Sequence, residues 1–112
     1  MIEKIILDHL SSKLDVPVYL ERPETPNQKY VLFEKTGSSV NNHIKAATLA
    51  IQSIAPSLLE AAELNEAVKA VMDDAIELDV ITHSELNSDY NYTNPTSKNY
   101  RYQAVYDVIF YD

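Results

Sequence analysis

The C-terminal segment of the chain alternates its side chains with the period of a β-strand, and it limits the possible folds more than any other segment. Six of the eight tyrosines of the 112-residue chain lie in residues 90–112. From residue 100, one face would carry Tyr100, Tyr102, Ala104, Tyr106, Val108 and Phe110, and the other Arg101, Gln103, Val105, Asp107, Ile109 and Tyr111. The first face is apolar throughout, and the second becomes apolar at Val105 and Ile109. Apolar side chains on both faces are typical of a strand inside a sheet, so we expect an internal strand that the domain needs for folding.

The length and composition of the chain indicate a single globular domain, residues 1–112. Hydrophobic residues make up 46% of the chain and charged residues 23%, which are ordinary values for such a domain. The chain has no cysteine, so disulfides and thiolate zinc sites are excluded. The N-terminal segment lacks the pattern of a signal peptide, and no window approaches the roughly 20 apolar residues of a membrane span. We therefore expect a soluble protein that stays where it is made.

The remaining patterns predict two helices and further strands. Apolar residues at helical spacing predict helices over residues 2–14 and 57–77, and the second opens with a capping box from Ser57 to Glu60. Further strands are expected over residues 18–20, 30–35, 43–54 and within 80–92, with turns or loops over residues 21–28, 37–42 and 93–99. This order predicts an α+β fold in which a mostly antiparallel sheet of four to five strands packs against two helices. Helices on one face would leave the other face of the sheet for a partner.

The chain is acidic, and its acidity is concentrated in the second predicted helix. The net charge is −8, and the isoelectric point is about 4.7. Residues 60–79 carry seven acids and a single base, Lys69. Because DNA and anionic membranes attract basic surfaces, neither is expected as a partner. The plainest interpretation of the acidic segment is a solvated helix face.

The sequence contains no pattern that points to catalysis or to a cofactor. His9, His43 and His83 lie in different predicted elements without metal-ligand spacing, so we expect them to be surface or strand histidines. One glycine cannot build a phosphate-binding loop. Asp73 and Asp74 are adjacent and would face different directions on a helix, which makes them a poor acid–base pair. We expect no enzyme activity, no metal and no cofactor.

Three stretches of the chain resemble the tail terminators of long-tailed bacteriophages, also called tail completion or tail-to-head joining proteins. They are residues 101–107 (Arg-Tyr-Gln-Ala-Val-Tyr-Asp), residues 29–37 (Lys-Tyr-Val-Leu-Phe-Glu-Lys-Thr-Gly), and residues 47–53 (Ala-Thr-Leu-Ala-Ile-Gln-Ser) followed by a helix. With the order of elements, the resemblance covers nearly the whole chain. It implies a structural protein of a phage or prophage that forms a hexameric ring on the tail tube, caps the tube and provides the surface that joins the head.

The resemblance also implies partners, a location and candidate contact residues. The partners would be other copies of the chain, the tail tube protein and a head-completion or neck protein, without specific nucleic-acid binding or a membrane. The protein would be in the host cytoplasm during assembly and then at the head-proximal end of the virion tail. The expected subunit contacts are Gly37, Ser38, Ser39, Val40, Asn41, Asn42, His43, Tyr90 and Tyr92. The acidic residues that would line a ring are Glu60, Glu63, Glu66, Asp73, Asp74 and Glu77, where they would repel passing DNA.

Three alternatives remain open on the sequence alone. A neighbouring neck or head-completion protein, which acts as a head–tail connector, would have a similar length. An acidic cytosolic regulator that mimics DNA or binds one partner protein would explain the charge. An enzyme of unknown type is the least favoured alternative.

The charge distribution predicts that the protein does not bind duplex DNA. At about 50 mM salt, where electrostatic attraction is strongest, we expect no mobility shift of duplex DNA at micromolar protein. Tight binding that weakens as salt rises would contradict this expectation and revive a nucleic-acid role.

Overall fold

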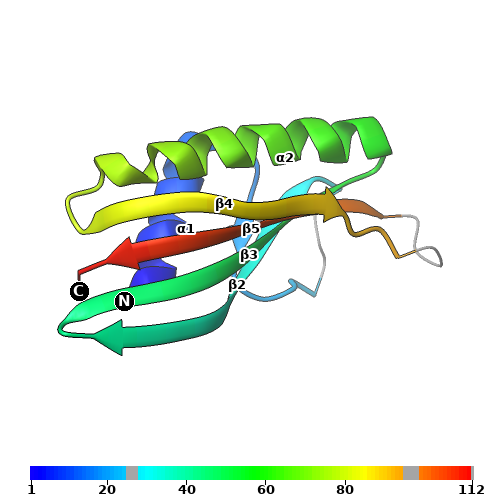
Figure 1. Ribbon diagram of the computed structural model, residues 1–112. Helices are drawn as coiled ribbons and strands as arrows, with labels where there is room; N and C mark the ends of the chain where they lie inside the picture. The colour runs from blue at the N-terminus through cyan, green and yellow to red at the C-terminus, as the bar shows by residue number, and fades with distance from the viewer. Residues whose placement is uncertain (25–27, 95–98, 112) are drawn as a thin grey trace.

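In residues 1–24, 28–94 and 99–111, which the computed structural model describes, the chain forms a five-stranded sheet and two α-helices (Figure 1). The elements are α1 (Ile2–Lys13), β1 (Val18–Tyr19), β2 (Tyr30–Asn41), β3 (Ile44–Ala55), α2 (Leu58–Asp73), the 3-10 helix η1 (Asp74–Glu77), β4 (Ile81–Asn91) and β5 (Tyr100–Phe110). The predicted fold class is confirmed. The predicted helix ends and strand positions agree with these bounds closely, apart from the segment before His43 and the end of the second helix.

The sheet has the strand order β1-β2-β3-β5-β4. The short β1 runs parallel to β2, and the other neighbouring pairs are antiparallel. β5 therefore lies between β3 and β4, as its two apolar faces predict. β3 and β5 pair in unbroken register from Lys45 opposite Phe110 to Ala55 opposite Tyr100.

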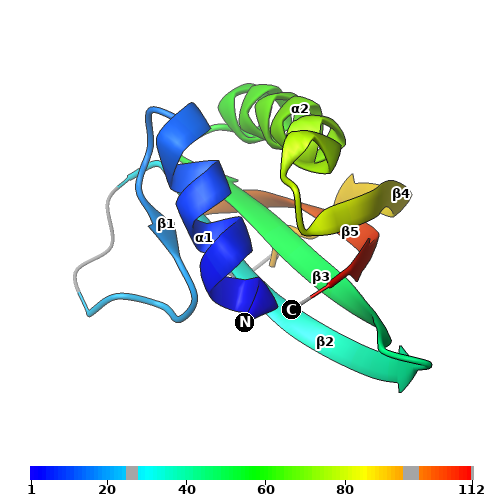
Figure 2. The ribbon, with the colours of Figure 1, turned by 90° about the vertical axis from the view of Figure 1, so that its left-hand side faces the viewer.

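Both helices pack on the same face of the sheet (Figures 1 and 2). α2 runs along the strands, while α1 crosses them (Figure 1). The helices and strands share one apolar core, formed by Ile2, Ile6, Leu10, Val31, Phe33, Ala47, Leu49, Ile51, Leu64, Val68, Met72, Ala75, Ile81, Ala104, Tyr106, Val108 and Phe110. Each large side chain buried here contributes about 1.5–3 kcal/mol to stability.

Two details of the predicted core and helix need correction. Tyr100 lies on the apolar face of the predicted terminal strand but is 37% exposed and outside the core, because it opens β5 at the end of the sheet. The predicted second helix changes to 3-10 geometry after Asp73, so its last turn is η1. Its start is as predicted, since Ser57 Oγ accepts a hydrogen bond from the Glu60 backbone N–H at 3.2 Å.

The segment from Gly37 to Asn42 was predicted to be a turn, and this prediction is wrong. β2 continues to Asn41 and stays paired with β3, and only Asn42 and His43 form the turn. Their φ angles are 51° and 69°. Two-residue hairpins favour positive φ at both positions because this geometry matches the twist of the strands. Residues 37–41 are thus held in a strand by their pairing with β3, although glycine, serine and asparagine have low strand propensity. The register shift between Lys35 and Gly37 marks a β-bulge.

A buried tyrosine ties β5 to α2. The Tyr106 hydroxyl points its hydrogen toward two acceptors, the Lys69 carbonyl oxygen at 3.1 Å and Asp73 Oδ1 at 3.2 Å. Burial, followed by the negative charge of Asp73, raises the pKa of this hydroxyl above its ordinary value of 10.0. The unfolded chain therefore loses this proton first, and the contribution is complete below about pH 10 and declines as the pH rises further.

We expect Tyr106→Phe to lower the free energy of unfolding by about 1 kcal/mol at pH 7, because the Lys69 carbonyl oxygen and the Asp73 carboxylate lose this hydrogen-bond donor. Above pH 10 the variant should lose stability less steeply than the wild type, by up to about 1.4 kcal/mol per pH unit. Denaturant unfolding between pH 7 and 11 measures both effects. Tyr111→Phe, at a half-exposed tyrosine, is the control and should follow the wild-type profile. Equal slopes for the wild type and Tyr106→Phe would contradict the assignment.

Candidate functional site

One face of the sheet has no helix over it in the described part of the chain. In Figure 1 this face is turned toward the viewer, and α1 lies behind the sheet. We call it the open sheet face, and it is formed by Ala46, Thr48, Ala50, Gln52, Gln103, Val105, Asp107 and Ile109, which pair across β3 and β5. Neighbouring side chains leave these residues buried or half-buried. Tyr30, beyond its edge, is buried and stacks edge-on against Tyr19.

A chain of polar side chains crosses the open sheet face from β3 to β4. Arg101 Nη1 donates to Gln52 Oε1 at 3.3 Å, and Gln52 Nε2 donates to Gln103 Oε1 at 3.1 Å. Gln103 Nε2 in turn donates to the Tyr90 hydroxyl. The Arg101 Nε atom is buried and has no hydrogen-bond acceptor in the described part of the chain. The network therefore holds a cationic group in a fixed orientation on the open sheet face.

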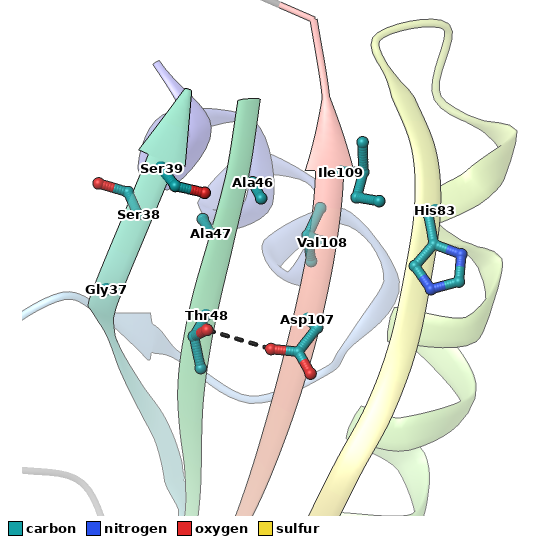
Figure 3. A pocket seen from close by; sticks show the side chains of 10 residues that line it. All are labelled: Gly37, Ser38, Ser39, Ala46, Ala47, Thr48, His83, Asp107, Val108 and Ile109. Atoms are coloured by element: carbon teal, nitrogen blue, oxygen red, sulfur yellow. Dashed lines mark hydrogen bonds between the residues drawn. The ribbon is translucent and has the colours of Figure 1, made fainter. Parts of the chain in front are cut away.

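The open sheet face is hollowed near the β2–β3 hairpin. The hollow has a volume of about 420 Å³, and Figure 3 shows the residues that line it: Gly37, Ser38, Ser39, Ala46, Ala47, Thr48, His83, Asp107, Val108 and Ile109. Both Asp107 carboxylate oxygens are occupied, since Thr48 Oγ1 and Asn87 Nδ2 donate to them at 3.1 and 3.0 Å. His83 lies at the rim and contacts Glu85 at 2.9 Å. Ala46, Val108 and Ile109 give the hollow an apolar part beside polar residues such as Ser39 and Thr48, so it suits a side chain of another protein.

The predicted contact residues lie at two separate places. Gly37–His43 belongs to the exposed hairpin, where Val40 is 67% exposed and the neighbouring Ile44 is 46% exposed. Tyr90 and Tyr92 lie at the opposite end of the sheet, where they are 41% and 48% exposed and their rings stack edge-on at 5.9 Å. The structure thus exposes both sets without bringing them together. A role in subunit contacts stays a prediction for each set.

The predicted acidic residues lie on α2 and η1, away from the open sheet face. Glu60 is half-buried, while Glu63, Glu66, Asp73, Asp74 and Glu77 are exposed. Lys69 neutralises part of this surface, because its Nζ contacts Glu66 and lies 3.0 Å from Asp89 Oδ2. Hydrogen bonds to Glu66 and then to Asp89 raise the pKa of Lys69. The remaining excess of negative charge is greatest around η1.

One expectation about the histidines is wrong. His9 is buried in α1, and its Nε2 lies 2.8 Å from the Val71 carbonyl oxygen, which joins α1 to α2. Its position on the apolar side of the predicted helix was the available signal. Among residues 1–24, 28–94 and 99–111, no group of three or more His, Cys, Asp or Glu side chains could hold a metal ion. No helix in those ranges is long and apolar enough to cross a membrane.

Sequence reasoning missed the network of Arg101, Gln52 and Gln103. The alternation of β5 places Gln103 on its polar face, but the partner across the sheet depends on register, which the sequence does not state. Two of the predicted loops, residues 21–28 and 93–99, include residues 25–27 and 95–98, which lie outside the described residues.

Comparison with known proteins gives a similarity of fold. No protein-family model matches the chain, and no curated protein sequence matches it. Among solved structures, the fold is similar to that of a chain in the virion of a native gene transfer agent (GTA) particle, with a TM-score of 0.56. The two chains are 15% identical, and the superposition covers 90% of this chain and 83% of the other. At this identity the similarity shows a common fold.

The geometry of the hairpin turn predicts a stabilising substitution. His43 adopts φ of 69°, which glycine adopts without steric cost, so His43→Gly should raise the free energy of unfolding by about 0.5–1 kcal/mol. Ser39→Gly is the control within the same hairpin and should lower stability by about 0.5 kcal/mol, because Ser39 has strand geometry. Thermal and denaturant unfolding measure both. A loss of stability in His43→Gly equal to that in the control would contradict the turn geometry.

Proposed function

We propose that the chain is a non-catalytic structural protein of a phage-like virion and that it acts as a tail terminator. Two independent lines support this proposal. Residues 29–37, 47–53 and 101–107 resemble tail terminators in sequence, and the fold is similar to a chain of a gene transfer agent virion. The same arguments support residues 1–112 as a single tail-terminator-like domain.

The main structural support for the proposal is that two strand edges and one face of the sheet are available for contacts with other proteins. β1 pairs with β2 only at Val31 and Leu32, so β2 has no strand on its outer side from Phe33 to Asn41 within the described residues. β4 is likewise an edge strand over its 11 residues. A monomeric protein usually shields such edges, because exposed backbone groups pair with other chains. Two edge strands and an open face suit a subunit that is completed by its neighbours.

A terminator needs one surface for the tube and another for the head, and it must not extend the tube. A ring of this chain, hexameric as in the family it resembles, would dock on the last ring of tail tube protein and cover the site where another tube subunit adds. Its opposite side would receive the head-completion or neck protein. Acidic residues such as Glu63, Glu66 and Asp74 would keep DNA from adhering as it passes. The protein would form this ring in the host cytoplasm and stay in the virion.

The open sheet face is the surface we assign to the tube or head partner. The hydrogen bond between Gln52 and Gln103 orders its side chains, and the face is hollowed beside Ala46. These features suit a surface that binds another virion protein by shape complementarity and catalyses no reaction. The open sheet face does not support the alternative of an enzyme. The alternative of an acidic regulator would not explain the hollow or the hydrogen-bond network of that face.

Deletion of the gene tests the proposal directly. Without the protein, tails should vary in length and fail to join heads, and electron microscopy measures both properties. A neck protein would instead leave tails of normal length that lack heads. Tails of normal length joined to heads in the deletion strain would refute both virion functions.

Complementation of the deletion tests the open sheet face. Ala46→Arg fills the hollow and should not restore head joining, because the new side chain occupies the space for the partner. Ser11→Arg, on the exposed side of α1, should restore it and controls for added charge and size. Both purified variants should keep the wild-type melting temperature. If Ala46→Arg fully restored head joining, the hollow would not be part of the surface that contacts the partner.

A further inference from the structure

The two edge strands of the sheet run in opposite directions. β2 is antiparallel to β3, β3 to β5, and β5 to β4, so β2 and β4 are also antiparallel. When β2 of one copy lies beside β4 of the next, the strands can therefore form an antiparallel ladder. The β2–β3 turn and the start of β4 lie at the same end of the sheet (Figure 1). This pairing would keep the corresponding ends of all copies aligned.

The hairpin and the η1 corner carry opposite charge. Residues 35–49 contain Lys35 and Lys45 but no acidic residue, in a chain whose net charge is −8. Glu3 offsets part of this charge, since its carboxylate lies 3.4 Å from Lys35 Nζ. Residues 73–79 contain four acidic residues and no base. The two segments lie at the same end of the molecule but on opposite edges of the sheet (Figure 1).

Each of these charged segments also exposes a large apolar side chain on the helix-covered side of the sheet. Val40 is opposite Lys45, on the side of β3 that also carries Ala47 and Leu49 of the core, and it is 67% exposed. Ile76 of η1 is 56% exposed and is flanked by acidic residues. With β2 beside a neighbour's β4, Val40 and Lys45 would face the neighbour's η1 at the same height. Antiparallel pairing of β2 with a neighbour's β4 would therefore bring the exposed apolar side chains together and also place the basic segment beside the acidic one.

We propose that copies of this chain associate head to tail, with the Val40–Lys45 hairpin tip of one copy docked on the η1 corner around Ile76 of the next. This inference rests on the proposed ring, and it assigns the partner and the contact. The two contacting surfaces differ, so the association is heterologous and closes into a ring or continues as a helix. Pairing of two β4 edges would bring Glu85 and Asp89 of both copies together, so charge disfavours that symmetric dimer. β2 carries Glu34 as well as Lys35, so charge does not decide against pairing of two β2 edges, and the cross-linking below tests it.

Cysteine cross-linking tests the contact cleanly because the natural chain has no cysteine. Under mild oxidation of concentrated protein, the Val40→Cys and Ile76→Cys double variant should form a ladder of covalent oligomers that ends at a closed ring. An equal mixture of the two single variants should give mixed dimers and few dimers of either variant alone. Leu59→Cys, also well exposed but at the other end of α2, replaces Ile76→Cys in the control mixture and should cross-link weakly.

Charge exchange supplies a second test in the same mixture. Lys45→Glu added to the Val40→Cys copy should reduce the yield of mixed dimers about tenfold, and Glu77→Lys added to the Ile76→Cys copy should do the same. The two charge variants together should restore the yield. All substitutions are at surface or half-buried positions, and the melting temperature of each variant verifies its fold.

The outcomes separate this contact from the proposed function. Predominance of Val40→Cys dimers, or equal yield with the Leu59→Cys control, would overturn the head-to-tail contact. Cross-linking addresses the contact between copies alone, whereas tail length and head joining address the terminator role. Abnormal tails in the deletion strain combined with failed cross-linking would therefore refute the contact and leave the function standing.

Discussion

The unbroken antiparallel pairing of β3 with β5 is the constraint on which the rest of the structure depends. It places Leu49 opposite Tyr106 and Ile51 opposite Ala104, which creates the apolar floor on which both helices pack. The same register places Gln52 opposite Gln103 and Thr48 opposite Asp107 on the other face, where both pairs form hydrogen bonds. One pairing thus builds the core and the open sheet face together.

The placement of both helices on one face explains what the molecule offers to partners. The apolar requirement of the core is met by α1 and α2, so the opposite face can combine polar with apolar side chains. Within residues 1–24, 28–94 and 99–111, β1 pairs with a short part of β2, and β4 pairs with a strand on its inner side alone. In the proposed assembly these edges join copies side by side, and the open sheet face is left for the tube or head.

The sequence predicts the elements whose side chains follow one clear period. The alternation from Tyr100 identifies an internal strand because both of its faces contain apolar residues, and the apolar stripe after Ser57 identifies α2. It does not predict the hairpin correctly, because Gly37–Asn41 owes its strand geometry to the long ladder with β3 rather than to its own propensities. The Arg101–Gln52–Gln103 network depends on register between distant segments, which local patterns do not contain. Burial of His9 against Val71 likewise depends on how two helices meet.

The central claim is that the free strand edges and the open sheet face are contact surfaces in an assembly on the tail tube. Hydrogen–deuterium exchange of the protein, alone and with isolated tail tubes, tests it most directly. The account predicts slower exchange in Phe33–Asn41 of β2 and in β4 when tubes are present, with the N-terminal half of α2 unchanged. Protection confined to α1 and α2, or exchange that tubes do not alter anywhere, would contradict it.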